Sequence, residues 1–278
     1  MNYFPVESPH LASAPWDQLN FDHRRRLISS IQHCIHVHGF AYVTGLVLPP
    51  MDEAECERVL RESSLELGIP ASHDLGGNEV WRIAVKNEYS EVPTFSQHNG
   101  AAGLHTDSQY REHPEDAFSL FTVSQASCGG GESWILHVRD IHTALSGMPD
   151  GERYLRLLRT EPVPFASPTI FNLEGDASVE VIEAPIFEGD KIRYRQDTLL
   201  RGRQEKPIEN PELMKALEAL EVAIHDNPNI QRFHADEGSC LYIDNKRTLH
   251  GRSEFHDSRR LMLRLRFNFD EANPVLTS

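Results

Sequence analysis

From residue 118 to residue 269 the sequence is a succession of short β-rich runs separated by glycine-rich turns. The first run covers residues 118–127, and a second follows the glycine triplet at 129–131. Strands and helices do not alternate regularly along the chain, which argues against a doubly wound parallel sheet. Many short strands joined by such turns are typical of two sheets packed face to face. We therefore predict a mostly β fold with a jelly-roll core.

Helical periodicity marks segments outside these runs, and Asp22 is the expected N-cap of the first. The predicted helices cover residues 22–38, 52–67, 139–145 and 211–225. Further strands are expected near residues 39–49, 160–172, 178–187 and 191–197. No linker of biased composition divides the chain of 278 residues. We predict one domain over residues 1–278, with its core at roughly 39–270, flanking helices and a helical insertion at about 209–226.

The chain carries a formal charge of −15 at neutral pH, from 42 acidic and 27 basic residues. Acidic proteins are poorly matched to phosphate backbones and anionic membranes, so we expect neither nucleic acid nor a membrane as a partner. The four cysteines have no CxxC spacing, which argues against a zinc knuckle and a disulfide framework. The amino-terminal segment lacks the basic start and apolar run of a signal peptide. We expect a cytoplasmic protein, either a monomer or a homo-oligomer.

His105 and Asp107 form a His-x-Asp motif. In an extended chain, residues i and i+2 point to the same side, so one imidazole and one carboxylate can reach the same metal ion. Two histidines and one carboxylate leave coordination positions open, as oxygen-activating Fe(II) requires. A second His-x-Asp, at His234 and Asp236, lies in a polar turn and is expected to shape a loop. The first copy is therefore the predicted part of a metal site.

The third ligand is assigned to His250, which ends an apolar strand and its turn and directly precedes Gly251. Because glycine has no side chain, a metal ion and a substrate can approach the backbone there. The competing residue, His256, lies in a charged run and is expected to face water. His105, Asp107 and His250 are thus the predicted Fe(II) ligands.

Arg260, Arg264 and Arg266 follow the third ligand and share one side of the predicted strand by its two-residue period. A guanidinium stays charged and binds a carboxylate through two parallel hydrogen bonds, so an arginine beside a metal site indicates an anionic ligand. 2-Oxoglutarate fits such a site. Its keto acid end chelates iron, and its distal carboxylate can bind an arginine. Periodicity alone does not decide which arginine binds it.

These motifs and their order resemble the taurine dioxygenase and clavaminate synthase-like superfamily of Fe(II)/2-oxoglutarate enzymes. The matching stretches are HTD at 105–107, GGES at 130–133, DNKRTLHGR at 244–252 and RRLMLRLRF at 259–267. The resemblance implies a double-stranded β-helix, another name for the jelly-roll core, with Fe(II), 2-oxoglutarate and O2 as cofactor and co-substrates. It also implies roles for individual residues: His105, Asp107 and His250 as metal ligands, Arg260 and the Ser133 hydroxyl as partners of 2-oxoglutarate, and Arg264 as a further arginine for co-substrate or substrate.

Asp107 is intact, whereas related halogenases replace this carboxylate with a small residue. The resemblance therefore implies hydroxylation, desaturation or ring closure at an unactivated C–H bond. Members of this superfamily place substrate-binding residues in the polar segment before the motif, so the resemblance implies substrate contacts at Arg82, Gln97, His98 and Asn99. Arg82 and Arg264 could hold a carboxylate of the substrate. The expected substrate is a small polar metabolite, an amino acid or a natural-product intermediate. The alternatives are a cupin-like metal sensor without turnover, a protein hydroxylase, and a zinc hydrolase, which would leave Arg260 unexplained.

Overall fold

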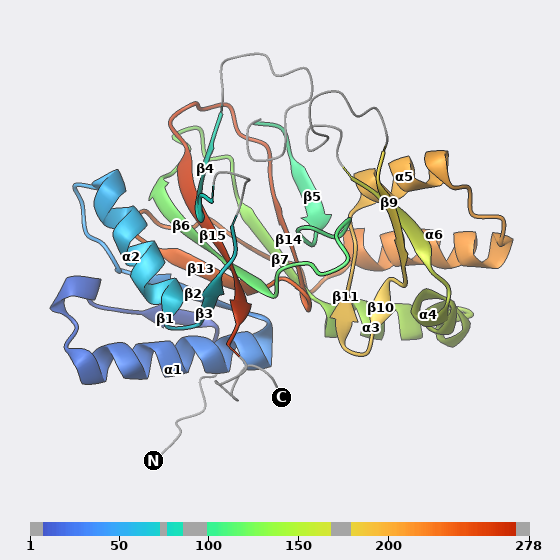
Figure 1. Cartoon of the computed structure of the whole chain (residues 1–278), viewed down its shortest axis with the longest axis horizontal. Helices are drawn as coiled ribbons and strands as arrows, with labels where there is room; N and C mark the ends of the chain where they lie inside the picture. The colour runs from blue at the N-terminus through green and yellow to red at the C-terminus, as the bar shows by residue number, and fades with distance from the viewer. Residues whose placement is uncertain (1–7, 73–76, 86–98, 168–178, 271–278) are drawn as a thin grey trace.

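Two largely antiparallel sheets form the core of the computed structural model, which describes residues 8–72, 77–85, 99–167 and 179–270 (Figure 1). The larger sheet consists, in spatial order, of β1 (His10–Ala12), β2 (Phe40–Thr44), β13 (Cys240–Asp244), β6 (Ala117–Ser124), β15 (Leu261–Phe269) and β3 (Gly68–Pro70), with β4 (Val80–Ala84) also paired to β15. The smaller sheet consists of β12 (Gln231–Phe233), β7 (Ser133–His137), β14 (Thr248–Arg252) and β5 (Ala102–His105). The predicted fold class is confirmed.

Apolar side chains from both sheets meet in an inter-sheet core. Phe118 of β6 and Leu241 of β13 come from the larger sheet, and Ile135 of β7 comes from the smaller one; all three are buried. Side chains alternate between the two faces of a strand, so one face of each sheet is available for this contact. The inter-sheet core therefore fixes how the two sheets sit relative to each other.

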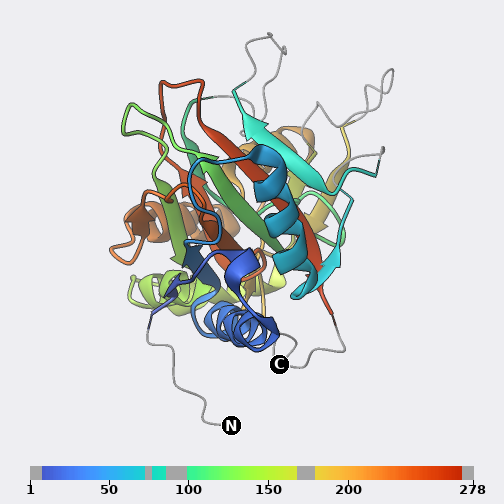
Figure 2. The ribbon, with the colours of Figure 1, turned by 90° about the vertical axis from the view of Figure 1, so that its left-hand side faces the viewer.

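Two helices, α1 (Phe21–His38) and α2 (Glu53–Leu65), pack on the other face of the larger sheet (Figure 2). Both lie close to the predicted positions. The N-cap of α1 is Asn20, whose side chain accepts a hydrogen bond from the backbone N–H of His23, so the prediction of Asp22 as the cap is wrong. Asp22 instead lies in the first turn, where a carboxylate is favoured by the helix dipole.

Four further helices form a second cluster beside the smaller sheet (Figure 1). They are α3 (Val138–Ser146), α4 (Gly151–Thr160), α5 (Gln196–Glu205) and α6 (Pro211–His225). Near them lie two hairpins, β8 (Val163–Ala166) with β9 (Val181–Ala184) and β10 (Phe187–Glu188) with β11 (Lys191–Ile192). The predicted helix at 211–225 is α6, and the short one at 139–145 lies within α3.

Neither α4 nor α5 was predicted from the sequence. A strand was expected over 191–197, but the strand covers only Lys191–Ile192 and α5 begins at Gln196. In α4 the fully buried leucines are only Leu155 and Leu158, among charged neighbours. Their spacing of three residues places them on one face of the helix, so an amphipathic pattern was present in α4 and sequence reasoning missed it. None of the helices in the described part of the chain is long and apolar enough to cross a membrane.

Candidate metal centre

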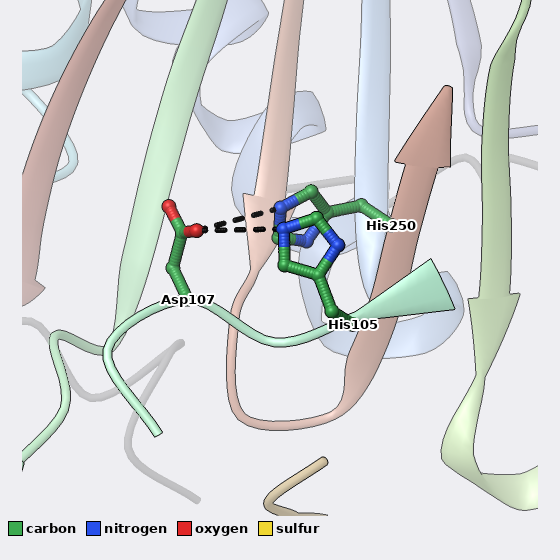
Figure 3. Close-up of side chains that lie close together, drawn as sticks. All are labelled: His105, Asp107 and His250. Carbon is green, nitrogen blue, oxygen red and sulfur yellow. Dashed lines mark ion pairs between the residues drawn. The ribbon is translucent and has the colours of Figure 1, made fainter. Parts of the chain in front are cut away.

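The three predicted metal ligands lie together between the two sheets (Figure 3). His105 is the last residue of β5 and is paired directly opposite His250 of β14. Asp107 follows two residues after the end of β5, so the three side chains converge from two strands. One ligand atom from each lies within 4.8 Å of the others, and no other such group occurs among the described residues.

The hydrogen bonds of the site orient its ligand atoms. Oδ1 of Asp107 lies 3.7 Å from Nε2 of His105 and 3.8 Å from Nε2 of His250. Nδ1 of His105 lies 2.7 Å from the carbonyl oxygen of Gly103, which can accept its N–H. A bond of this kind sets the tautomer, so the Nε2 lone pair of His105 is left for a metal ion.

Asn245, in the turn between β13 and β14, fixes the backbone that carries Asp107. Its Oδ1 accepts a hydrogen bond from the N–H of Asp107 at 2.7 Å, and its Nδ2 donates to the carbonyl of Asp107 at 3.1 Å. Nδ2 also donates to the carbonyl of Glu115 at 3.0 Å. One buried amide thus ties the loop that carries the carboxylate to the turn that precedes His250.

The electrostatic environment favours the charged form of Asp107 and the neutral form of His250. Burial raises the pKa of Asp107, but the charges of Arg264 and Arg266 outweigh it and hold that pKa well below its usual range. Burial, reinforced by His105, lowers the pKa of His250 well below its usual value. A charged carboxylate and a neutral imidazole are the forms that bind divalent metals.

The arginines of β15 point into the site, as the two-residue period predicts. Nη1 of Arg264 and Nη2 of Arg266 both donate to Oδ2 of Asp107, at 2.8 and 3.1 Å. Arg266 also lies 3.7 Å from Oε1 of the buried Glu115. Sequence reasoning placed Arg266 on this side of the strand but gave it no role.

Arg260 is buried beside the two histidines, in a pocket that it shares with Ser133 and Arg264. Its Nη2 donates to Sδ of Met262 at 2.6 Å, and no carboxylate among the described residues forms an ion pair with it. Burial, together with the charge of Arg252, lowers its pKa to about 9. A buried guanidinium without a counter-ion is costly, so this pocket is suited to an anion.

Arg252 lines the same pocket and was missed by sequence reasoning. It is paired with Ser133 across β14 and β7, and its guanidinium donates to the carbonyl of Gly100. The ring of Phe255 lies beneath the guanidinium groups of both Arg252 and Arg260, at 4.6 and 5.2 Å from the ring centroid. The signal was available: Arg252 follows His250 by two residues in a strand.

Sequence reasoning also missed an ion pair at the start of α5, between Arg195 and Asp197. Nε and Nη2 of Arg195 donate to the two carboxylate oxygens of Asp197, at 2.7 and 3.0 Å. The preceding residue, Tyr194, is tied to Thr106, whose N–H donates to the Tyr194 carbonyl at 2.8 Å. The charge of Arg195 contributes to the lowered pKa of His250. No local motif signals this pair, because a tertiary contact brings it to the site.

The structure does not bring the predicted substrate residues that it describes before the motif, Arg82 and Asn99, together at the pocket. Arg82 does not reach the pocket: its Nε donates to Oε1 of Glu53 in α2 at 2.8 Å, and the neighbouring Ile83 lines the pocket instead. Asn99 is exposed, and its carbonyl accepts the N–H of Phe255 at 2.9 Å. Gln97 and His98 lie outside the described residues.

The competing histidines lie apart from the metal ligands. In the second His-x-Asp motif, Oδ2 of Asp236 accepts a hydrogen bond from the hydroxyl of Tyr42 at 3.1 Å, so this carboxylate shapes a loop as expected. His256 is exposed, and its backbone N–H donates to Sγ of Cys128 at 3.3 Å.

The chain is similar to known proteins in sequence. The sequence model of a protein family, the taurine catabolism dioxygenase TauD, TfdA family, matches residues 8–266 of this chain. The chain is 25% identical over 219 residues to glutarate 2-hydroxylase from Klebsiella pneumoniae (strain 342), covering 75% of this chain and 63% of that protein. It is 26% identical over 204 residues to glutarate 2-hydroxylase from Citrobacter koseri, covering 70% and 57%. The chain thus spans less than two thirds of the length of these relatives.

Solved structures share the fold at low sequence identity. An asparagine oxygenase in complex with Fe(II), 2S,3S-3-hydroxyasparagine and succinate matches with a TM-score of 0.70 and 18% identity, over 91% of this chain and 81% of that one. The non-heme iron oxygenase OrfP in complex with Fe and alpha-ketoglutaric acid matches with a TM-score of 0.66 and 18% identity, over 89% and 82%. The two-sheet core of this chain is therefore a double-stranded β-helix, the fold of these solved structures.

Proposed function

Because the chain belongs to the TauD/TfdA family of dioxygenases, we propose that it is an Fe(II)- and 2-oxoglutarate-dependent oxygenase. The reaction is hydroxylation, desaturation or ring closure at an unactivated C–H bond of a small polar metabolite. The observation that carries this proposal is the buried guanidinium of Arg260, which has no ion-pair partner among the described residues and shares a pocket with His105 and His250.

The donor set fits Fe(II). His105, Asp107 and His250 supply two imidazole nitrogens and one carboxylate oxygen, the set that leaves coordination positions open in iron oxygenases. When bound, iron and 2-oxoglutarate together supply the oxidising chemistry, and the protein supplies binding, orientation and electrostatics. Asn245 and the backbone of Gly103 orient the ligands for this task.

The pocket beside the metal site fits a dicarboxylate. Arg260 can bind the distal carboxylate of 2-oxoglutarate through parallel hydrogen bonds, which would supply the counter-ion that its burial demands. Ser133 lines the same pocket and can donate its hydroxyl to that carboxylate. The keto acid end would then face His105 and His250.

The substrate side of the site is assigned to Arg264, which lines the pocket nearer to Asp107. A guanidinium there suits a carboxylate of an amino acid or of a related acid. Related proteins are consistent with this class, since the curated relatives are named for glutarate and the structural neighbours for asparagine and for complexes with hydroxylated arginine.

The proposal is tested by anaerobic loading of the full chain with Fe(II) and 2-oxoglutarate, followed by addition of O2. Succinate is measured with and without a panel of amino acids and dicarboxylic acids. We expect succinate above background with at least one panel member, and none in His105→Ala. Absence of succinate under every condition, together with absence of 2-oxoglutarate binding, would refute the enzyme function and favour a metal sensor.

A further inference from the structure

The two carboxylate oxygens of Asp107 face different groups. Oδ1 faces the imidazoles of His105 and His250, as the dashed lines of Figure 3 show. Oδ2 accepts hydrogen bonds from Arg264 at 2.8 Å and Arg266 at 3.1 Å. The carboxylate is therefore divided between a metal side and an arginine side.

Arg266 belongs to a buried network, whereas Arg264 faces the pocket. The other terminal nitrogen of Arg266 lies 3.7 Å from Oε1 of Glu115, and this same oxygen accepts a hydrogen bond from Arg111 at 2.9 Å. Arg264 lines the metal pocket, and Asp107 is its only ion-pair partner among the described residues. Arg264 can therefore turn toward a ligand, while Arg266 is held between two buried carboxylates.

We infer that Arg266 is a positioning residue that keeps Oδ2 of Asp107 out of the metal site, so that the carboxylate binds through Oδ1 alone. This inference rests on the proposed function, because it requires a divalent ion on His105, Asp107 and His250. Without Arg266, Arg264 alone among the described residues holds Oδ2, and Arg264 faces the pocket and can turn away. The carboxylate can then rotate and bind the ion through both oxygens. It would then occupy a coordination position that the chelating end of 2-oxoglutarate needs.

The charge of Arg266 has an opposite effect on the metal ion itself. A fixed cation close to a divalent ion repels it, and a buried site screens this repulsion weakly. Removal of the charge is therefore expected to strengthen metal binding, while it weakens binding of 2-oxoglutarate to the loaded protein. General damage to the fold would weaken both. A positioning role therefore predicts opposite changes in the affinities for the metal ion and for 2-oxoglutarate, whereas a structural role predicts that both affinities fall.

The test uses the full chain and Co(II) as a spectroscopic substitute for Fe(II). Calorimetry measures the affinity for Co(II) and then for 2-oxoglutarate, and the visible spectrum reports the coordination of the bound cobalt. For Arg266→Met we expect equal or tighter Co(II) binding, at least tenfold weaker 2-oxoglutarate binding, on the order of 1.4 kcal/mol, and an altered cobalt spectrum before 2-oxoglutarate is added. Arg266→Lys, which keeps the charge and a donor, should recover most of the 2-oxoglutarate affinity.

Two further variants complete the design. Arg111→Met removes an arginine from Glu115 without touching Asp107 and should leave both affinities unchanged. Where Arg266→Met does not fold, the double variant Glu115→Gln/Arg266→Met removes one charge of each sign and gives the same measurement. An unchanged spectrum and unchanged 2-oxoglutarate affinity would overturn the inference alone, as would a parallel loss of both affinities. If the wild-type chain binds no Co(II), the proposed function fails and this inference fails with it.

Discussion

His105 and His250 lie directly opposite each other in the pairing of β5 with β14, and the centroids of their rings are 4.2 Å apart. The backbone ladder therefore fixes the separation of two proposed metal ligands that are distant in the sequence. Asp107 joins them because it follows His105 by two residues. A slip of the register by one residue would turn one histidine to the opposite face of the sheet, so the metal site depends on correct strand pairing.

Loss of one ligand should abolish metal binding. We expect His250→Ala to lower the affinity for Co(II) by more than about 100-fold, because loss of a residue that merely supports a ligand already costs about 10–100-fold. Calorimetry on the metal-depleted chain measures this change. His234→Ala, in the other His-x-Asp motif, is the matched control and should bind Co(II) as the wild type does. Equal affinity in His250→Ala and the wild type would contradict the assignment.

Arg260 should account for the affinity for 2-oxoglutarate. Removal of one partner of a buried charged pair costs about 2–5 kcal/mol, so Arg260→Ala should weaken 2-oxoglutarate binding by roughly 30-fold or more. The neighbouring Arg259 is exposed and pairs with Asp257, so Arg259→Ala is the control and should bind normally. A normal affinity in Arg260→Ala with a reduced one in Arg264→Ala would move the anchor to Arg264.

Gly129 and Gly131, in the turn before β7, should differ in their effect on 2-oxoglutarate binding. Gly129 and Gly131 both have positive φ, 75° and 80°, so alanine at either costs about 1–2 kcal/mol of backbone strain. A Cβ at Gly131 would lie 3.0 Å from Nε of Arg260, whereas one at Gly129 would meet nothing within 4 Å. We expect similar destabilisation in both variants, measured by urea unfolding, but weaker 2-oxoglutarate binding only in Gly131→Ala. Equal binding by the two would contradict the contact.

His137 should make stability depend on pH. Burial, followed by the charges of Arg139 and Arg247, lowers its pKa to about 4, and Asp190 opposes this shift. In the unfolded chain a histidine takes up its proton near pH 6.5. The free energy of unfolding should therefore fall as the pH is lowered from about 6.5 to about 4, by on the order of 3 kcal/mol in full.

The variant His137→Asn checks this dependence. His137 caps α3 by accepting the N–H of Arg139 at 3.0 Å, and asparagine is also a favourable N-cap. Urea unfolding at several pH values should show a shallower fall for His137→Asn than for the wild type. His256→Gln, at an exposed position, should follow the wild type. Parallel profiles for His137→Asn and the wild type would show that His137 is not the titrating group.

The sequence predicted the elements whose pattern is strong and local. The alternation over the predicted strand placed Arg260, Arg264 and Arg266 on one side. In the structure Arg260 and Arg264 line the pocket, and Arg264 and Arg266 donate to Asp107. The alternation could not show which carboxylate each arginine contacts, because Asp107 and Glu115 approach Arg264 and Arg266 through tertiary contacts. In a strand that is polar on both faces, a two-residue alternation also does not show which set of side chains faces the pocket. Arg82 was expected in the pocket because it lies in the polar segment before the motif, but Ile83 lines the pocket and Arg82 pairs with Glu53.

The missed features share a physical cause. The pair Arg195 and Asp197 is adjacent to the metal ligands only because Tyr194 is hydrogen bonded to Thr106. Asn245 was part of a recognised motif, but its hydrogen bonds to Asp107 cross between distant parts of the chain. Contacts of this kind depend on the register of paired strands and on loop geometry, which local propensity does not encode.

The inter-sheet core has a consequence for which keto acids can bind. His105 and His250 belong to the smaller sheet, whereas Arg260 precedes β15 of the larger one. Phe118, from the larger sheet, packs edge-on against His250 with ring centroids 4.6 Å apart. The distance between the proposed iron site and Arg260, the proposed partner of the far carboxylate, therefore depends on the size of the side chains that fill the inter-sheet core. We expect Phe118, which lines this pocket and packs against His250, to help determine the chain length of the co-substrate that fits.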